Sequence, residues 1–118
     1  MAKKLWKGNE AVAEAALRGG CNFFAGYPIT PSSEALEYLS WRMPEIGRNF
    51  IQAENEIASM NMVTGASACG ARALTATSGP GGSLKVEGAS YAARASIPYV
   101  LLNVQRWGTG LGALDSGQ

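Results

Sequence analysis

The chain has 118 residues, 47% of them hydrophobic, which is enough to bury one core of ordinary size. Its 10 basic and 9 acidic residues are scattered without a run of like charge, so the sequence lacks the basic surface of a nucleic-acid-binding protein. The start of the chain is basic, but Gly8, Asn9 and Glu10 follow where the apolar core of a signal peptide would stand. No apolar stretch approaches the roughly 20 residues of a membrane span, so we expect a cytoplasmic protein with no nucleic-acid or membrane partner.

Helical and strand patterns alternate along the chain. In the first half, a helix is predicted from an N-cap at Asn9 to the Gly19-Gly20 pair, and a second from Thr30-Pro31 until Pro44 stops it. From Glu54 to about Cys69, apolar and small residues surround a third predicted helix, which indicates a buried one. A glycine-rich loop over residues 78–83 leads into a fourth helix, to about Ala95. The predicted strands cover residues 22–27, 49–53, 73–77 and 99–104.

This alternation predicts an α/β fold of three layers, doubly wound around a mainly parallel sheet. The fourth strand is a continuous apolar run of the kind that is buried on both faces of a parallel sheet. Beyond Arg106 the chain continues through Gly108, Gly110 and Gly112 without another element, so we expect a truncated domain.

The two cysteines, Cys21 and Cys69, stand at neither metal-ligand nor C-x-x-C spacing. We therefore expect both to be reduced residues of the core, and we predict no metal ligands in this chain.

Four segments follow the predicted strands, at residues 27–33, 54–56, 78–83 and 105–108. In open parallel sheets, ligands bind beyond the carboxyl ends of the strands, so these segments are the candidate site.

Each segment also has a purely structural interpretation. Thr30 and Ser32 can cap a helix, and Glu54 and Glu56 suit the positive end of a helix dipole. The glycine-rich loop can hold a phosphate, although its spacing fits neither the Rossmann nor the P-loop motif. Arg106 can be an exposed charge at the end of a strand.

Five motifs occur in the following order: Gly8-Asn9-Glu10-Ala11, Gly26-Tyr27-Pro28-Ile29-Thr30-Pro31, Gln52-Ala53-Glu54-Asn55-Glu56-Ile57-Ala58, Thr77-Ser78-Gly79-Pro80-Gly81 and Asn103-Val104-Gln105-Arg106. Together they resemble the alpha-type subunit of 2-oxoacid:ferredoxin oxidoreductases. Glu56, Gly65 and Ser96-Ile97-Pro98 also resemble the pyrimidine domain of acetolactate-type thiamine enzymes. Gln52-Ala53-Glu54 and Gly110-Leu111-Gly112 are most similar to the branched-chain 2-oxoacid (2-oxoisovalerate) type.

Some residues depart from the family pattern. Trp107 stands where a glycine usually follows the arginine, and Gly82, Lys85 and Val86 replace bulkier, less charged residues. The family's subunit is also much longer. The resemblance therefore implies that residues 1–118 are the N-terminal part of a pyrimidine-binding domain, whose remaining strands and later domains are absent here.

The resemblance implies a thiamine-diphosphate-binding fold and the oxidative decarboxylation of a 2-oxoacid, such as pyruvate or 2-oxoisovalerate, to acyl-CoA with reduction of ferredoxin. Glu56 is implied as the catalytic residue that activates the cofactor's aminopyrimidine ring, and Thr30 and Arg106 as substrate-binding residues. The implied cofactor-binding residues are Tyr27, Pro28, Ile29, Glu56, Ser78, Gly79, Pro80 and Gly81.

The resemblance also implies partners, so the isolated chain is expected to be inactive. A beta-type subunit would hold the diphosphate and Mg²⁺, beside a ferredoxin-like iron–sulfur subunit and a gamma-type subunit. Iron–sulfur clusters are expected on the partners only, because two cysteines fall short of the four thiolates that a cluster usually needs.

Two other functions fit parts of the pattern. One is a non-catalytic α/β nucleotide-binding module, whose helix N-termini would hold an anion. The other is a thiamine-dependent decarboxylase or acetolactate-type synthase that needs no ferredoxin. The segment Tyr27-Pro28-Ile29-Thr30-Pro31 favours the ferredoxin-dependent family.

Overall fold

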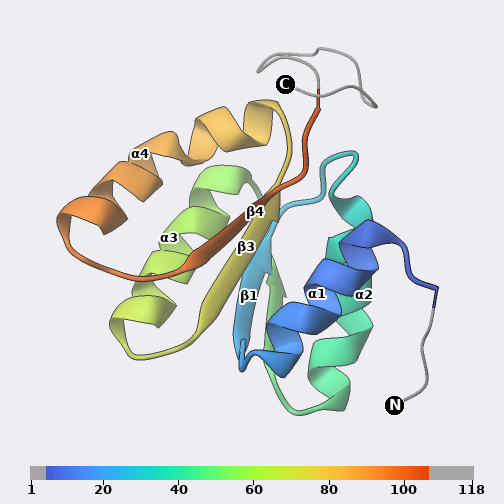
Figure 1. Ribbon diagram of the computed structural model, residues 1–118. Helices are drawn as coiled ribbons and strands as arrows, with labels where there is room; N and C mark the ends of the chain where they lie inside the picture. Colours follow the sequence, from blue (N-terminus) through green and yellow to red (C-terminus); the bar gives the residue numbers. More distant parts are fainter. Residues whose placement is uncertain (1–4, 107–118) are drawn as a thin grey trace.

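Four strands and four helices alternate along residues 5–106, the part of the chain that the computed structural model describes (Figure 1). The helices are α1 (Gly8–Arg18), α2 (Ser33–Glu45), α3 (Glu56–Ala68) and α4 (Pro80–Arg94). The strands are β1 (Phe23–Gly26), β2 (Asn49–Gln52), β3 (Ala73–Thr77) and β4 (Val100–Asn103).

All the strands are parallel, and their order in the sheet is β2-β1-β3-β4. Phe24 of β1 pairs with Phe50 of β2 and with Leu74 of β3. Helices α1 and α2 cover one face of the sheet, and α3 and α4 cover the other (Figure 1). The predicted three-layer, doubly wound fold is therefore confirmed.

The two faces of β1 are buried against different helices, because successive side chains of a strand point to opposite faces. Phe24 belongs to a large apolar cluster with Leu36 and Leu39 of α2. Ala25, its neighbour, packs in a smaller cluster with Val63 of α3. The bulkier core thus lies on the α1/α2 face, and smaller clustered residues allow α3 to lie close to the other face.

A buried carboxylate ties α1 to α2. Glu14 accepts hydrogen bonds from Arg18 Nε at 2.9 Å, Tyr38 Oη at 2.7 Å and Arg42 Nε at 3.2 Å. Burial raises the pKa of Glu14, but the three donors together lower it further, to about 2. The carboxylate therefore stays charged at neutral pH and fixes α2, whose preceding loop borders the carboxyl edge of the sheet.

Several predicted helix boundaries are wrong. Helix α2 begins at Ser33, after the Thr30-Pro31 loop, and contains Pro44 in its last turn, where the ring removes only one backbone hydrogen bond. Helix α3 begins at Glu56 because Asn55 caps it, its Oδ1 accepting from Ala58 N at 2.8 Å. Helix α4 begins at Pro80, inside the predicted loop, because proline suits the first helical turn.

Three predictions about burial are also wrong. Strand β4 is not buried on both faces, because none of its residues is buried and Val100 is 61% exposed. Cys21 is buried as predicted, but Cys69 follows the end of α3 and is exposed. Ile57 of α3 is half-exposed, so this helix is buried on one side only.

The predictions that concern Trp107 and the glycine-rich tail lie outside the described residues. Among the helices of residues 5–106, none is both long enough and apolar enough to cross a membrane.

Candidate functional site

The predicted site segments meet at the carboxyl edge of the sheet. Strand β1 continues through α2 to β2 on one side, and its neighbour β3 continues through α4 to β4 on the other (Figure 1). The chain therefore leaves these adjacent strands in opposite directions, which is the arrangement that opens a ligand-binding crevice in a parallel sheet. The loop after β1 and the start of α4 lie at this edge of the sheet.

The loop after β1 is tied to α1. Asn9 Nδ2 donates a hydrogen bond to Pro31 O at 2.7 Å. The prediction that Asn9 caps α1 is wrong, because Lys7 takes the N-cap position and the Asn9 side chain holds this loop instead.

The serine and threonine of this loop do not cap α2. Ser32 is the N-cap residue, but its Oγ donates to Ile29 O at 2.8 Å and makes no capping bond. Thr30 lies two residues further from the helix and is exposed, as are Tyr27 and Pro28. The capping interpretation of this segment is therefore wrong, and three side chains of the loop are instead exposed after the carboxyl end of β1.

Glu56 and Glu54 lie in different environments. Glu56 is the first residue of α3 and is 6% exposed, whereas Glu54 is exposed. The Cγ of Glu56 lies 3.1 Å from the position that a Cβ would take at Gly81, so this side chain runs inward beneath the start of α4. An acidic residue that only complements the helix dipole does not need such burial.

Strand β3 ends in two buried hydroxyl groups. Thr77 and Ser78 are fully buried, and neither hydroxyl has a hydrogen-bond partner among the described residues. Gly79 adopts a left-handed conformation, with φ +47°, and a Cβ at Gly81 would collide with Thr77 Oγ1. The glycines thus bring α4 against β3 and Glu56. Because buried polar atoms without partners are costly, the two hydroxyls indicate a place for a ligand.

Arg106 follows β4 and reaches back across the edge of the sheet. Its side chain is buried, and its Nη1 donates a hydrogen bond to Thr30 O at 3.4 Å. Its Cδ lies 3.0 Å from the position that a Cβ would take at Gly79. Arg106 therefore joins the loop after β1 to the turn after β3, and its interpretation as an exposed charge is wrong.

Sequence reasoning missed Lys85 as a residue of this region. Lys85 is 1% exposed, and its Nζ donates to Ser59 Oγ at 2.8 Å and to Thr75 Oγ1. Burial lowers the pKa of Lys85, the negative charge of Glu56 raises it, and the result is about 8. The sequence spacing could have indicated this burial. Lys85 lies on the same face of α4 as Gly81 and Gly88, and two glycines on one helix face indicate close packing there.

Two hollows whose walls are made of described residues lie away from the edge where the predicted residues meet. The larger one, of about 690 Å³, lies beside α1 at the amino ends of the strands and includes Cys21, Ala73 and Val100 in its walls. A smaller one of about 240 Å³ lies between α3 and α4, against Ile57 and Leu84. The polar groups at the carboxyl edge therefore locate the candidate site better than the size of a hollow does.

Comparison with known proteins assigns the chain to a family. The profile described as pyruvate flavodoxin/ferredoxin oxidoreductase, thiamine diphosphate-binding, matches residues 14–113. Ketoisovalerate oxidoreductase subunit VorB of Methanothermobacter thermautotrophicus is 51% identical over 118 residues, which are 100% of this chain and 34% of that protein. The 2-oxoglutarate synthase subunit KorA of Archaeoglobus fulgidus is 54% identical over 112 residues, 95% of this chain and 32% of its own.

A solved structure agrees with these matches. The 2-oxoglutarate:ferredoxin oxidoreductase from Magnetococcus marinus, with 2-oxoglutarate, coenzyme A and succinyl-CoA bound, superimposes with a TM-score of 0.90 at 41% identity, over 92% of this chain and 19% of that one. This chain thus spans about a third of the length of the two curated relatives, at 34% and 32%. By its profile match and its fold, the chain belongs to the thiamine diphosphate-binding family of pyruvate flavodoxin/ferredoxin oxidoreductases.

Proposed function

We propose that this chain supplies the half-site for the aminopyrimidine ring of thiamine diphosphate in a 2-oxoacid:ferredoxin oxidoreductase. The whole enzyme would convert a 2-oxoacid and coenzyme A to acyl-CoA and carbon dioxide, and would pass the electrons to ferredoxin. The observation that carries the proposal is the burial of Glu56 beside Gly81 and Thr77, while Glu54 stays in solvent.

The residues at the carboxyl edge fit an aminopyrimidine ring. The ring carries nitrogen atoms that need hydrogen-bond partners, and the site offers one buried carboxylate and two buried hydroxyls that lack partners among the described residues. Gly79 carries no side chain of its own, and the side chain that lies against it is Arg106, whose Cδ is 3.0 Å from the Cβ position at Gly79, so the proposed substrate-binding residue borders the proposed cofactor turn.

Thiamine diphosphate supplies a carbon nucleophile for the 2-oxoacid carbonyl and an electron sink for the loss of carbon dioxide. The role of Glu56 would be to hold a proton at the pyrimidine ring nitrogen. Ser78 to Gly81 would form the wall of the cofactor site, together with Tyr27, Pro28 and Ile29. Arg106 would bind the carboxylate of the substrate, because a guanidinium can donate two parallel hydrogen bonds, and Thr30 would contact its carbonyl group.

The remaining parts of the enzyme would belong to partner subunits. We propose a beta-type subunit for the diphosphate and Mg²⁺, a ferredoxin-like subunit for the iron–sulfur clusters, and a gamma-type subunit. A cytoplasmic location stays a prediction. The branched-chain 2-oxoacid also stays a prediction, and a comparison of kcat/KM for 2-oxoisovalerate, pyruvate and 2-oxoglutarate would test it.

The central experiment is Glu56→Gln in the complete complex. The neutral amide keeps the shape of the side chain but cannot hold the proton, so we expect hydrogen–deuterium exchange at the reactive thiazolium carbon of the cofactor to slow by about 100-fold or more. Subunit assembly should be retained. Quenched-flow exchange followed by NMR of the extracted cofactor measures this step without depending on ferredoxin.

Glu54→Gln is the matched control, because it makes the same chemical change on an exposed carboxylate two residues away. We expect its exchange rate to equal that of the unmodified complex. If Glu56 only complemented the dipole of α3, Glu56→Gln would cost about 0.3–1 kcal/mol of stability and leave exchange intact. An unchanged exchange rate in an assembled Glu56→Gln complex would therefore refute the proposed function.

A further inference from the structure

We propose that Lys85 is a positioning residue for Glu56: its ammonium group, acting through Ser59, fixes the first turn of α3 and thereby the direction of the Glu56 carboxylate. This inference rests on the proposed role of Glu56 and deepens it. It concerns a side chain whose hydrogen bonds go to Ser59 and Thr75, residues outside the proposed cofactor-binding and substrate-binding sets.

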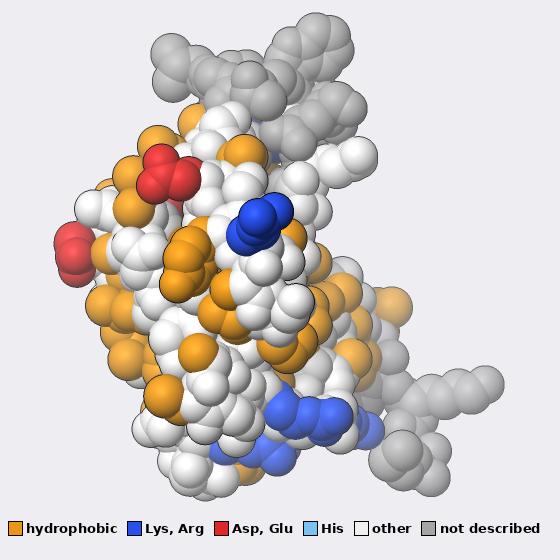
Figure 2. All heavy atoms as spheres, turned by 90° about the vertical axis from the view of Figure 1, so that its left-hand side faces the viewer, with side chains coloured by type: hydrophobic (Ala, Val, Ile, Leu, Met, Phe, Trp, Pro, Cys, Tyr) orange, Lys and Arg blue, Asp and Glu red, His pale blue; other side chains and the backbone are white. Residues whose placement is uncertain are grey.

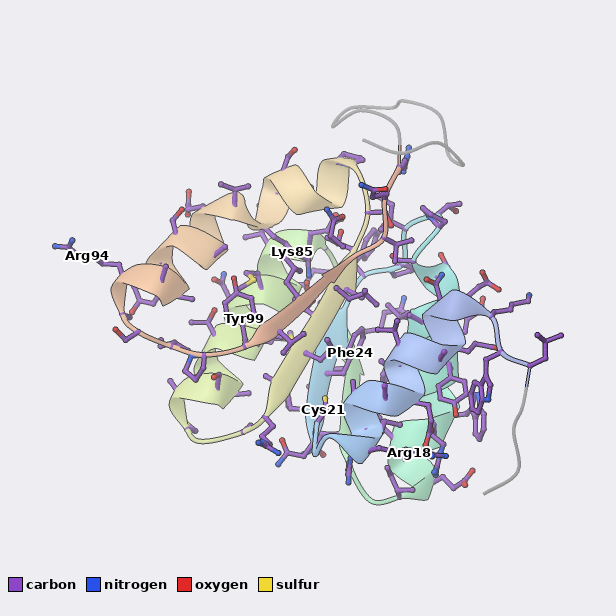
Figure 3. The ribbon with its side chains drawn as sticks, in the orientation of Figure 1. Arg18, Cys21, Phe24, Lys85, Arg94 and Tyr99 are labelled. Atoms are coloured by element: carbon purple, nitrogen blue, oxygen red, sulfur yellow. The ribbon has the colours of Figure 1, made fainter. Side chains whose placement is uncertain are left out.

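A chain of hydrogen bonds connects the two residues. Lys85 extends from α4 between α3 and β3 (Figure 3), and its Nζ donates to Ser59 Oγ at 2.8 Å and to Thr75 Oγ1. Ser59 Oγ in turn donates to the backbone carbonyl of Glu56 at 2.8 Å. One ammonium group thus joins β3, α3 and α4 at the turn that carries Glu56.

Stability alone does not account for a lysine at this position. Lys85 is 1% exposed and, among residues 5–106, forms no ion pair within 4 Å, so its charge is desolvated with only neutral hydroxyls as acceptors. Because burying a charge without a counter-ion costs desolvation free energy, an apolar residue of similar volume at this position need not lower the free energy of unfolding. What the ammonium adds is a fixed contact and a positive charge behind Glu56.

Glu56 is also the charged residue that interacts with Lys85. Lys85 is packed against α3 and β3, where Ser59 and Thr75 are neutral, and the charge of Glu56 is the one that raises its pKa in the described part of the chain. Because burial holds that pKa near 8, the ammonium is charged at neutral pH and loses its proton in mildly alkaline solution. Its hold on α3 should therefore weaken as the pH rises through about 8.

The test uses the complete complex, freed of thiamine diphosphate and titrated with it by calorimetry between about pH 6 and 10. We expect Lys85→Met to weaken binding, so that the dissociation constant for thiamine diphosphate rises about tenfold at pH 7, with no fall in the thermal midpoint of the complex. The affinity of the unmodified complex should decline above about pH 8, whereas that of the variant should be low and flat with pH.

Two further variants separate positioning from packing. Ser59→Ala breaks the same chain of hydrogen bonds and should weaken binding in the same direction. Thr64→Val removes a comparable hydroxyl that donates to Met60 O at 2.8 Å, away from Lys85, and should leave binding unchanged. In a Glu56→Gln background, Lys85→Met should cause no further loss of kcat/KM, because it acts through Glu56.

An assembled Lys85→Met complex with normal affinity and a normal pH profile would overturn the inference, even if Glu56→Gln slowed exchange as expected and so supported the proposed function. If Lys85→Met failed to assemble, Ser59→Ala would decide, and unchanged affinity in that variant would overturn the inference. Full turnover by Glu56→Gln would instead refute the proposed function, and the inference would fall with it.

Discussion

Arg106 is the residue whose interpretation the structure changes most. Its guanidinium is buried between Thr30 and Gly79, at the edge where the proposed cofactor site lies. If it binds the substrate carboxylate, Arg106→Ala in the complete complex should lower kcat/KM by roughly 30- to 1000-fold, which corresponds to a loss of about 2–4 kcal/mol. Steady-state kinetics with several 2-oxoacids measures this loss, which should appear for each of them because they share the carboxylate.

Arg94 offers the matched control. It lies at the end of α4 and points away from the sheet (Figure 3). Arg94→Ala should leave kcat/KM within about twofold, since an exposed charge contributes little. Normal kinetics for Arg106→Ala with every 2-oxoacid would show that its guanidinium only braces the two loops.

Single residues also show what the sequence could and could not predict about the site. The motifs predicted that Glu56, Ser78 and Arg106 would meet at one edge, because the carboxyl ends of parallel strands share it. They could not predict that Glu56 is buried and Glu54 is not, because that difference arises where Asn55 caps α3 and α4 packs against it. Lys85 was missed since its hydroxyl partners come from two other elements, α3 and β3.

At the scale of elements, the contact between α3 and α4 depends on glycine at specific positions. A Cβ at Gly81 would collide with Thr77 Oγ1 and lie 3.1 Å from Glu56 Cγ. Gly81→Ala should therefore push α4 away from the site and lower the free energy of unfolding by about 1–3 kcal/mol. Urea unfolding measures this change, and calorimetry should show weaker thiamine diphosphate binding in the complex.

Gly82→Ala tests whether the effect of Gly81→Ala depends on the close packing at that position or would follow any change from glycine to alanine in α4. A Cβ at Gly82 would meet nothing within 4 Å, so alanine should raise the free energy of unfolding by about 0.5–1 kcal/mol through its better helix propensity. Equal effects of the two substitutions would contradict the close approach of α4.

Contacts between elements also explain the errors in the predicted boundaries. Strand β3, Ala73–Thr77, was predicted to the residue because its apolar run is bounded by clear turn signals. The start of α2 was misplaced, because Thr30-Pro31 is equally typical of a helix start and of a loop, and the bond from Asn9 to Pro31 that favours the loop spans two elements. Local patterns identify the elements, whereas contacts between them set their ends.

At the scale of the whole molecule, one face carries exposed apolar side chains. Figure 2 shows hydrophobic side chains spread over the α3/α4 side with few charged groups between them. Ile57 of α3 and Leu84, Val86 and Tyr91 of α4 are large hydrophobic residues of these two helices that are exposed, Val86 and Tyr91 by 60% and 64%. Because contiguous apolar surface favours association, we expect the 118-residue chain on its own to sediment as species larger than its 12.3 kDa mass.

Charge placed on this face should reverse the association. The double substitution Val86→Lys and Tyr91→Lys adds two ammonium groups at exposed positions of α4, so it should shift the sedimentation profile towards monomer with little change in unfolding free energy. Ile46→Lys is the control, because it removes an exposed apolar side chain at the end of α2, on the other side of the sheet. Association through the α3/α4 face predicts that this control still associates. A monodisperse monomer of the unmodified chain at high concentration, or an equal response to both changes, would contradict the assignment of this face.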